Sequence, residues 1–252
     1  MDADALRDWL ATSGDPAGSA WELVLERKPS LAAAYVGFAR LGRENPALDA
    51  RTRALLVVGL EASVTNLGFG DVPGVVDAAL AAGATPEEIL EVLALSSIIG
   101  LHTATVGVPA LVEALRAHGD DPLAEPLDER RQELWDRYLG DKTYWKSFKG
   151  EMDVFLRGLL ALDPGMFEAY MELTLEPWTN GTLPAKVREL VYIAVDSVTT
   201  HLYRPGLDVH LQTALKLGAT KEEIMAVYEL AAAYGLRTVS AGVAALAGKE
   251  AQ

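Results

Sequence analysis

The sequence contains two copies of one segment. Shifting the chain by 135 positions aligns residues 48–111 with residues 183–246 without a gap, and about 23 of the 64 aligned residues are identical. The match is densest where GATPEEI, at 83–89, returns as GATKEEI at 218–224. The duplication therefore predicts two related units, and a polar residue present in one copy alone is a candidate for function.

Composition limits the classes of function that this chain can have. Half of its 252 residues are apolar, which is enough for a core in each half. The net charge of -14, without a cluster of Lys and Arg, disfavours nucleic acid as a partner. There is no cysteine, so disulfides, thiolate metal sites and thiol redox catalysis are excluded.

The sequence gives no indication of export or of a membrane. No uninterrupted apolar run reaches the roughly 18 residues that a membrane span requires. The first residues lack the basic and apolar segments of a secretory signal. We therefore expect a cytoplasmic protein with no membrane partner.

Apolar residues recur at helical spacing, without the sustained alternation of half-buried strands, and this pattern predicts an all-α fold. Helices over 50–66 and 185–201 are apolar almost all round and are expected at the centre of the core. The glycine that opens each GAT segment is expected in the left-handed conformation just past a helix end. Its threonine and second glutamate are expected to form a capping box.

A segment rich in Gly, Asp and Pro predicts the joint between the two units. We expect a linker at 118–131, which places the first repeat at 1–117 and the second at 132–252.

The second copy carries the pattern His-x3-Ala-x3-Gly-Ala-Thr-x-Glu-Glu-Ile, from His210 to Ile224, preceded by Arg188-Glu189-Leu190. This pattern resembles the core motif of the carboxymuconolactone decarboxylase family, which includes the alkyl hydroperoxidase D type. With its duplicate, the resemblance covers about two-thirds of the chain. It implies two tandem AhpD-like helical domains, and it implies a homo-oligomer because the family's small domains assemble as trimers or hexamers.

The resemblance also bears on activity. The peroxidase branch of the family has a C-x2-C-x3-H pattern, whose cysteines would fall at Tyr203 and Gly206, so a thiol peroxidase is disfavoured. The decarboxylase branch works without a cofactor. The resemblance therefore implies a cofactor-independent enzyme that decarboxylates or isomerises a small cyclic carboxylic acid or lactone. A non-catalytic helical module that binds a small molecule or a partner protein is the alternative.

Comparison of the copies points to one site. Five polar residues of the second copy align with residues in the first that are mostly apolar or glycine: His201 with Asn66, Tyr203 with Gly68, Arg204 with Phe69, Asp208 with Pro73 and His210 with Val75. We therefore expect an active site in the second repeat and a degenerate one in the first.

Each of these residues has a chemical role and a structural alternative. His210 could deliver a proton, with His201 as its partner, because the pKa of histidine lies near neutrality. Tyr203 could donate to an oxyanion and Arg204 could bind a carboxylate. Asp208 is expected to point away, since it lies two residues from His210 on one helix. Alternatively, His210 is a buried structural residue and His201 complements the negative end of a helix. Tyr203 and Arg204 would then lie on the surface.

His102 of the first copy aligns with Arg237 of the second, and each is a polar residue at an apolar helix start. Both are candidates for substrate binding, and a helix of the first repeat could close the site of the second if the repeats pack with pseudo-twofold symmetry. We expect no metal, because the four histidines lack His-x3-His or His-Glu-x2-His spacing. No glycine-rich nucleotide-binding loop is found either.

Overall fold

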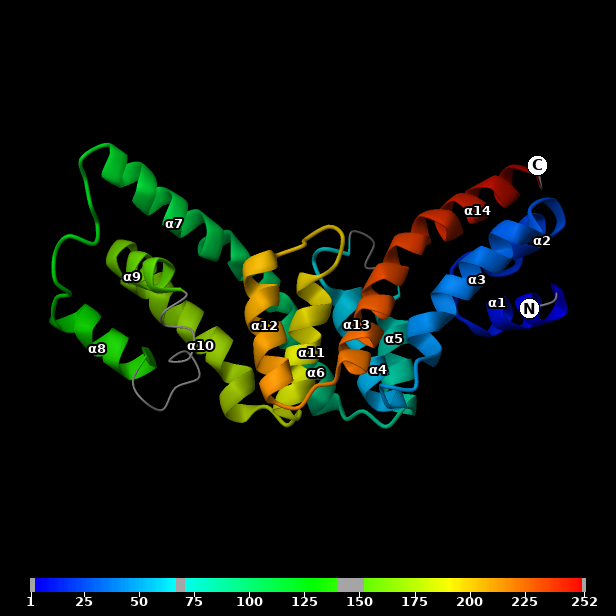
Figure 1. The fold of residues 1–252 in the computed structure, drawn as a ribbon, viewed down its shortest axis with the longest axis horizontal. Helices are drawn as coiled ribbons and strands as arrows, with labels where there is room; N and C mark the ends of the chain where they lie inside the picture. The colour runs from blue at the N-terminus through cyan, green and yellow to red at the C-terminus, as the bar shows by residue number, and fades with distance from the viewer. Residues whose placement is uncertain (1–2, 67–70, 140–151, 251–252) are drawn as a thin grey trace.

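The computed structural model describes residues 3–66, 71–139 and 152–250, which form helices and no strand. The all-α prediction is thus confirmed. The helices α3 to α7 correspond in order to α10 to α14, as the sequence repeat predicts (Figure 1). The helices are α1 (Ala3–Thr12), α2 (Trp21–Arg27), α3 (Pro29–Glu44), α4 (Ala50–Ala62), α5 (Val72–Ala81), α6 (Pro86–Ser97), α7 (His102–Ala117), α8 (Glu129–Leu139), α9 (Asp153–Leu162), α10 (Pro164–Asn180), α11 (Ala185–Asp196), α12 (Arg204–Lys216), α13 (Lys221–Ala233) and α14 (Arg237–Glu250).

The signals at the helix ends are confirmed. Gly83 and Gly218 follow α5 and α12 with φ of +90° and +84°, a conformation that glycine adopts without the cost of a Cβ atom. A complete capping box, in which threonine and glutamate each bind the other's backbone N–H, begins both α6 and α13. These features explain why the GAT segments persist in both copies.

The two central helices are shorter than predicted. α4 ends at Ala62 and α11 at Asp196, four and five residues before the expected ends. Ser63 leaves α4 in an extended conformation, which interrupts the helical hydrogen bonds. The apolar pattern continues after α11 because the following turn is still packed on the core, where Val198 is buried. Periodicity therefore reported burial correctly but overstated helix length.

Helices from both repeats share one central core. α4 and α6 of the first repeat pack with α11 and α13 of the second (Figure 1). Leu55 and Leu190, which occupy equivalent positions, are both fully buried there. The two repeats are therefore joined through their most apolar helices.

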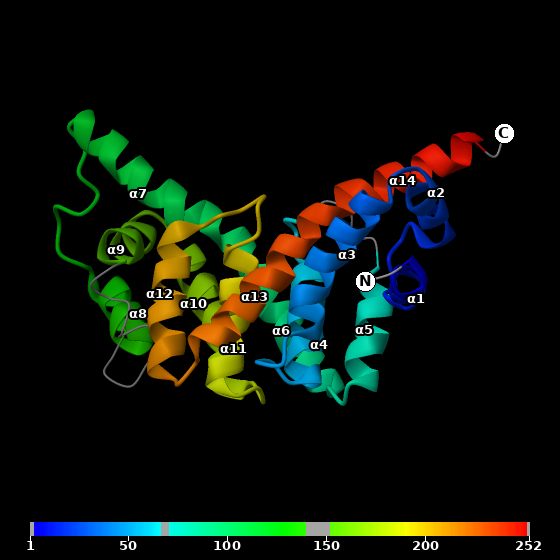
Figure 2. The same ribbon diagram turned by 45° about the vertical axis from the view of Figure 1, so that its right-hand side comes forward.

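Each repeat also packs its first helices against the last helix of the other repeat. α14 lies on α2 and α3, and Tyr35 of α3 forms a hydrogen bond with Ser240 of α14 (Figures 1 and 2). In the same way, α7 lies on α9 and contributes Ala104 to the cluster around Phe155. Residues 118–128 connect the repeats without a helix, and α8 already begins at Glu129, within the predicted linker. The repeats are thus consecutive in sequence but interlocked in space.

Among the residues that the structure describes, two helical stretches are long and apolar enough to cross a membrane by length and composition alone. They are Pro86–Ala117 and Lys221–Lys249, with mean hydropathies of 1.7 and 1.4. Half of the first apolar window is buried inside the protein, as in the core helices of soluble proteins that meet the same criterion. These stretches are therefore weak evidence for a membrane location.

Candidate active site

A cavity of about 570 Å³ lies beside α11 and α12 of the second repeat. The loop before α12 and its first turns form one wall, α10 contributes Tyr170, and the start of α7 contributes His102 and Thr105. A helix of the first repeat therefore helps to line a cavity of the second, which is the arrangement that the sequence comparison suggested for repeats packed with pseudo-twofold symmetry. The volume is sufficient for a small organic molecule.

His210 faces this cavity and is paired with a buried carboxylate. Its Nδ1 lies 2.7 Å from Oε2 of Glu189, and the Glu189 side chain is fully buried in α11. The His210 ring stacks on Tyr192, with ring centroids 4.3 Å apart. This packing fixes the imidazole, and the carboxylate can stabilise its protonated form. The partner of His210 is thus Glu189, and the expectation that His201 fills this role was wrong.

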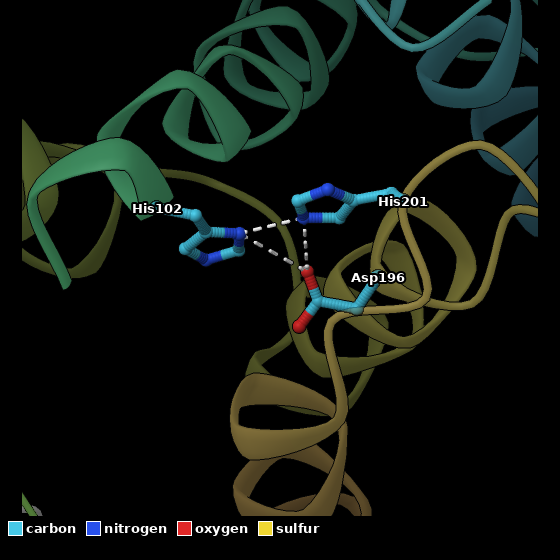
Figure 3. A group of neighbouring side chains, drawn as sticks. All are labelled: His102, Asp196 and His201. Carbon is cyan, nitrogen blue, oxygen red and sulfur yellow. Dashed lines mark hydrogen bonds and ion pairs between the residues drawn. The ribbon is translucent and has the colours of Figure 1, made fainter. Parts of the chain in front are cut away.

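His201 instead contacts His102 of the other repeat. The Nδ1 of His102 lies 2.7 Å from the Nε2 of His201, and both nitrogens lie 3.8 Å from Oδ1 of Asp196 (Figure 3). Burial raises the pKa of Asp196 to about 7. Burial, together with charge on His201 and His210, lowers the pKa of His102 to about 3, and burial lowers that of His201. The neutral form of both imidazoles is therefore favoured.

Tyr203 lines the cavity next to His102 and Asp196. Its hydroxyl donates to Oγ1 of Thr105 at 2.9 Å, and its ring stacks on His102 at 3.8 Å between centroids. Burial raises the pKa of Tyr203, so the hydroxyl keeps its proton at neutral pH. Leu202 precedes it with φ of +47°, which is a costly conformation for a leucine. The turn between His201 and Tyr203 is therefore held by the surrounding contacts.

Arg204 and Asp208 lie at the exposed edge of the cavity. Nε of Arg204 donates to Oδ1 of Asp208 at 2.6 Å, and 78% of the Arg204 side chain is exposed. Asp208 is therefore paired with Arg204, and the partner of His210 is Glu189.

Arg237, the remaining candidate for substrate binding, lies outside this cavity at the equivalent position of the other half. Its guanidinium binds both carboxylate oxygens of Glu61, with Nη1 at 3.0 Å from Oε1, and Nη1 lies 3.4 Å from Oδ1 of Asn66. Glu61 is fully buried. The first-repeat site is thus occupied by an ion pair that spans the two repeats.

Sequence reasoning missed two residues of the site. Glu189 aligns with Ala54, so the comparison that selected His210 could also have selected this carboxylate. Asp196 aligns with Glu61, so both copies have an acid at this position. The comparison selected residues that differ between the copies and therefore did not select Asp196.

These features define a class of protein: an all-helical fold duplicated in tandem, with a histidine and a buried carboxylate beside a cavity that both repeats close. Residues 29–120 and 164–248 match the model of the carboxymuconolactone decarboxylase family, so the chain belongs to this family. The resemblance inferred from the His210 motif is confirmed.

A solved structure agrees over the full length. It is the crystal structure of a protein of Burkholderia xenovorans LB400 that is provisionally named a gamma-carboxymuconolactone decarboxylase subunit. It is 38% identical, with a TM-score of 0.83, and the match covers 100% of this chain and 99% of that one. No protein of curated function matches the chain.

Proposed function

We propose that this chain is a carboxymuconolactone decarboxylase-like enzyme that acts on a small cyclic carboxylic acid or lactone by a proton transfer needing no organic cofactor. The observation that carries the proposal is the pair of His210 and Glu189 beside the cavity. A fully buried carboxylate 2.7 Å from an imidazole orients the ring and gives it a charged partner, an arrangement that suits general acid–base catalysis. The family and the provisional name of the related structure support the same class of reaction.

In the proposed reaction, loss of CO2 from the substrate leaves an electron pair that is delocalised onto a carbonyl oxygen. The imidazolium of His210 donates its proton to carbon, and the neutral imidazole is then reprotonated from water. Glu189 stabilises the imidazolium before the transfer. Tyr203 supplies a neutral hydroxyl near the developing oxyanion, provided that it turns from Thr105. An isomerisation would begin instead from the neutral imidazole of His210, which would take a proton from one carbon of the substrate and return it to another.

The test is turnover with a gamma-carboxymuconolactone as the first substrate, followed by related cyclic acids and lactones. CO2 release and product absorbance distinguish decarboxylation from isomerisation. His210→Gln is expected to lower kcat by about 10²–10⁴-fold, the usual contribution of general acid catalysis. The matched control is His118→Gln, at an exposed position outside the cavity. Unchanged turnover in His210→Gln would contradict the proposal.

The alternative, a non-catalytic binding module, does not require a buried carboxylate behind His210. Tight binding without turnover across the substrate panel would favour it. A homo-oligomer and a cytoplasmic location remain predictions, and light scattering of the purified chain tests the first of them.

A further inference from the structure

His102, His201 and Asp196 form a compact set of nitrogen and oxygen donors. His102 begins α7 in the first repeat, whereas Asp196 ends α11 and His201 follows it in the second repeat (Figure 3). The three donor atoms are separated by 2.7, 3.8 and 3.8 Å. The point equidistant from them therefore lies about 2.0 Å from each, which is the length of a bond from zinc to histidine nitrogen or carboxylate oxygen.

Asp196 is a buried carboxylate whose basic neighbours are histidines. Its side chain is 1% exposed, and its Oδ2 is buried with no hydrogen-bond partner. Among the residues that the structure describes, no lysine or arginine forms an ion pair with it. A buried carboxylate in this position is costly unless a proton or a cation compensates it.

The equivalent site of the first repeat shows what compensates the carboxylate there. Glu61 aligns with Asp196, Asn66 with His201 and Arg237 with His102. The Arg237 guanidinium binds both oxygens of Glu61. In the second site, an imidazole replaces the guanidinium and the fixed positive charge is lost, while two nitrogen ligands are gained.

We propose that His102, Asp196 and His201 bind one divalent transition-metal ion, with open coordination positions toward the cavity. Two imidazoles and one carboxylate favour zinc or ferrous iron over magnesium or calcium. Binding requires both facing nitrogens to be unprotonated, and a tetrahedral arrangement moves them apart by about 0.6 Å.

The expectation of no metal rested on local histidine spacing, which cannot register a site whose ligands come from two repeats. The ion would place positive charge beside the cavity that Asp196 and His210 share. This proposal goes beyond the proton transfer assigned to His210 and Glu189, and it does not depend on that reaction.

The test uses the full chain without an affinity tag, treated with a chelator and dialysed. Calorimetric titration with Zn²⁺ and absorption titration with Co²⁺ are expected to give one ion per chain. His102→Gln and His201→Gln are each expected to weaken Co²⁺ binding by at least about 100-fold, since even second-shell partners contribute 10- to 100-fold. His118→Gln, at an exposed position, is the matched control and should bind as the native chain does.

His102→Arg keeps the test decisive if the glutamine variants fold poorly. It copies the arrangement of Arg237 and Glu61, so it should fold and should show no rise in Tm when Zn²⁺ is added, whereas the native chain should show one. Absence of saturable binding to the native chain, or stoichiometric binding that survives in His102→Gln and His201→Gln, would overturn the metal site. Loss of turnover alone would bear only on the proposed reaction.

Discussion

Glu61 and Asp196 occupy equivalent positions in the two repeats, but only Glu61 is bound by an arginine. The arginine comes from the other repeat, so the ion pair joins the halves as well as neutralising the acid. At the second position the carboxylate faces two histidines and a cavity. The acid of the first repeat is thus placed to stabilise the fold, whereas the acid of the second repeat is placed beside a cavity where it could act on a ligand.

Replacing Glu189 with Gln should lower kcat by about 10- to 100-fold, with a smaller change in KM. The amide keeps the size of the side chain but removes the charge that stabilises a protonated His210. Steady-state kinetics with a substrate that the turnover assay shows to be converted measure this effect. Glu125→Gln, in the exposed linker, is the control. A Glu189→Gln enzyme with native kcat would show that the charge does not act in the reaction.

Arg237→Leu should lower the free energy of unfolding by about 2–3 kcal/mol, because it leaves a fully buried Glu61 without its partner. The loss is smaller than for a fully buried pair, since 37% of the Arg237 side chain is exposed. Urea denaturation at pH 7 measures it. Arg7→Leu, which breaks the exposed ion pairs with Asp4 and Glu22, should cost much less. Equal losses in the two variants would contradict this account.

The difference in free energy of unfolding between Arg237→Leu and the native chain should become smaller as the pH falls from 7 toward 4. Burial raises the pKa of Glu61, but the hydrogen bonds and charge of Arg237 outweigh it and hold the pKa below its ordinary value. In Arg237→Leu, burial dominates and favours protonation of Glu61, so the variant regains stability as the pH falls from 7 toward the ordinary carboxyl range. The native chain keeps its stabilisation over that range and loses it only at lower pH, through the lowered pKa. A difference that stays constant with pH would rule out this explanation.

Gly206→Ala should destabilise the chain by about 1–3 kcal/mol and disturb the site. A Cβ atom there would collide with Oδ2 of Asp196 and lie 2.7 Å from the Tyr203 ring. The control is Gly107→Ala in α7, where a Cβ meets nothing within 4 Å and should raise stability by about 0.5–1 kcal/mol. Thermal and urea unfolding measure both changes. Stabilisation by Gly206→Ala would contradict the packing described.

The two halves should depend on each other for folding. Separate chains of residues 1–117 and 118–252 would expose the faces that α7 and α14 bury on the opposite repeat. We expect low helicity for each half by circular dichroism and recovery of helicity when the halves are mixed. Full helicity and cooperative unfolding of either half alone would instead support independent domains with the predicted boundary.

The sequence predicts the local structure of this chain well because local rules determine it. The capping boxes depend on three-residue spacing, and Gly83 and Gly218 depend on their own backbone angles. His210 and Tyr203 are detected because the first repeat lacks them. These features require no knowledge of tertiary contacts.

The rest of the site depends on contacts between distant segments. His102 and His201 are 99 residues apart, and the exchange of last helices between repeats brings them together. The partner of Arg237 is 176 residues away for the same reason. Neither periodicity nor motif spacing indicates that the last helices pack on the opposite repeat. For this reason the sequence predicts that Arg237 binds substrate and that His201 is the partner of His210.

The most direct test of the central claim is decarboxylation in D2O, followed by analysis of where deuterium enters the product. If His210 is the proton donor, the native enzyme places deuterium on one face of one carbon. His210→Gln should then lose CO2 release, or give a product labelled on both faces. The same rate and the same single-face labelling in His210→Gln would contradict the account.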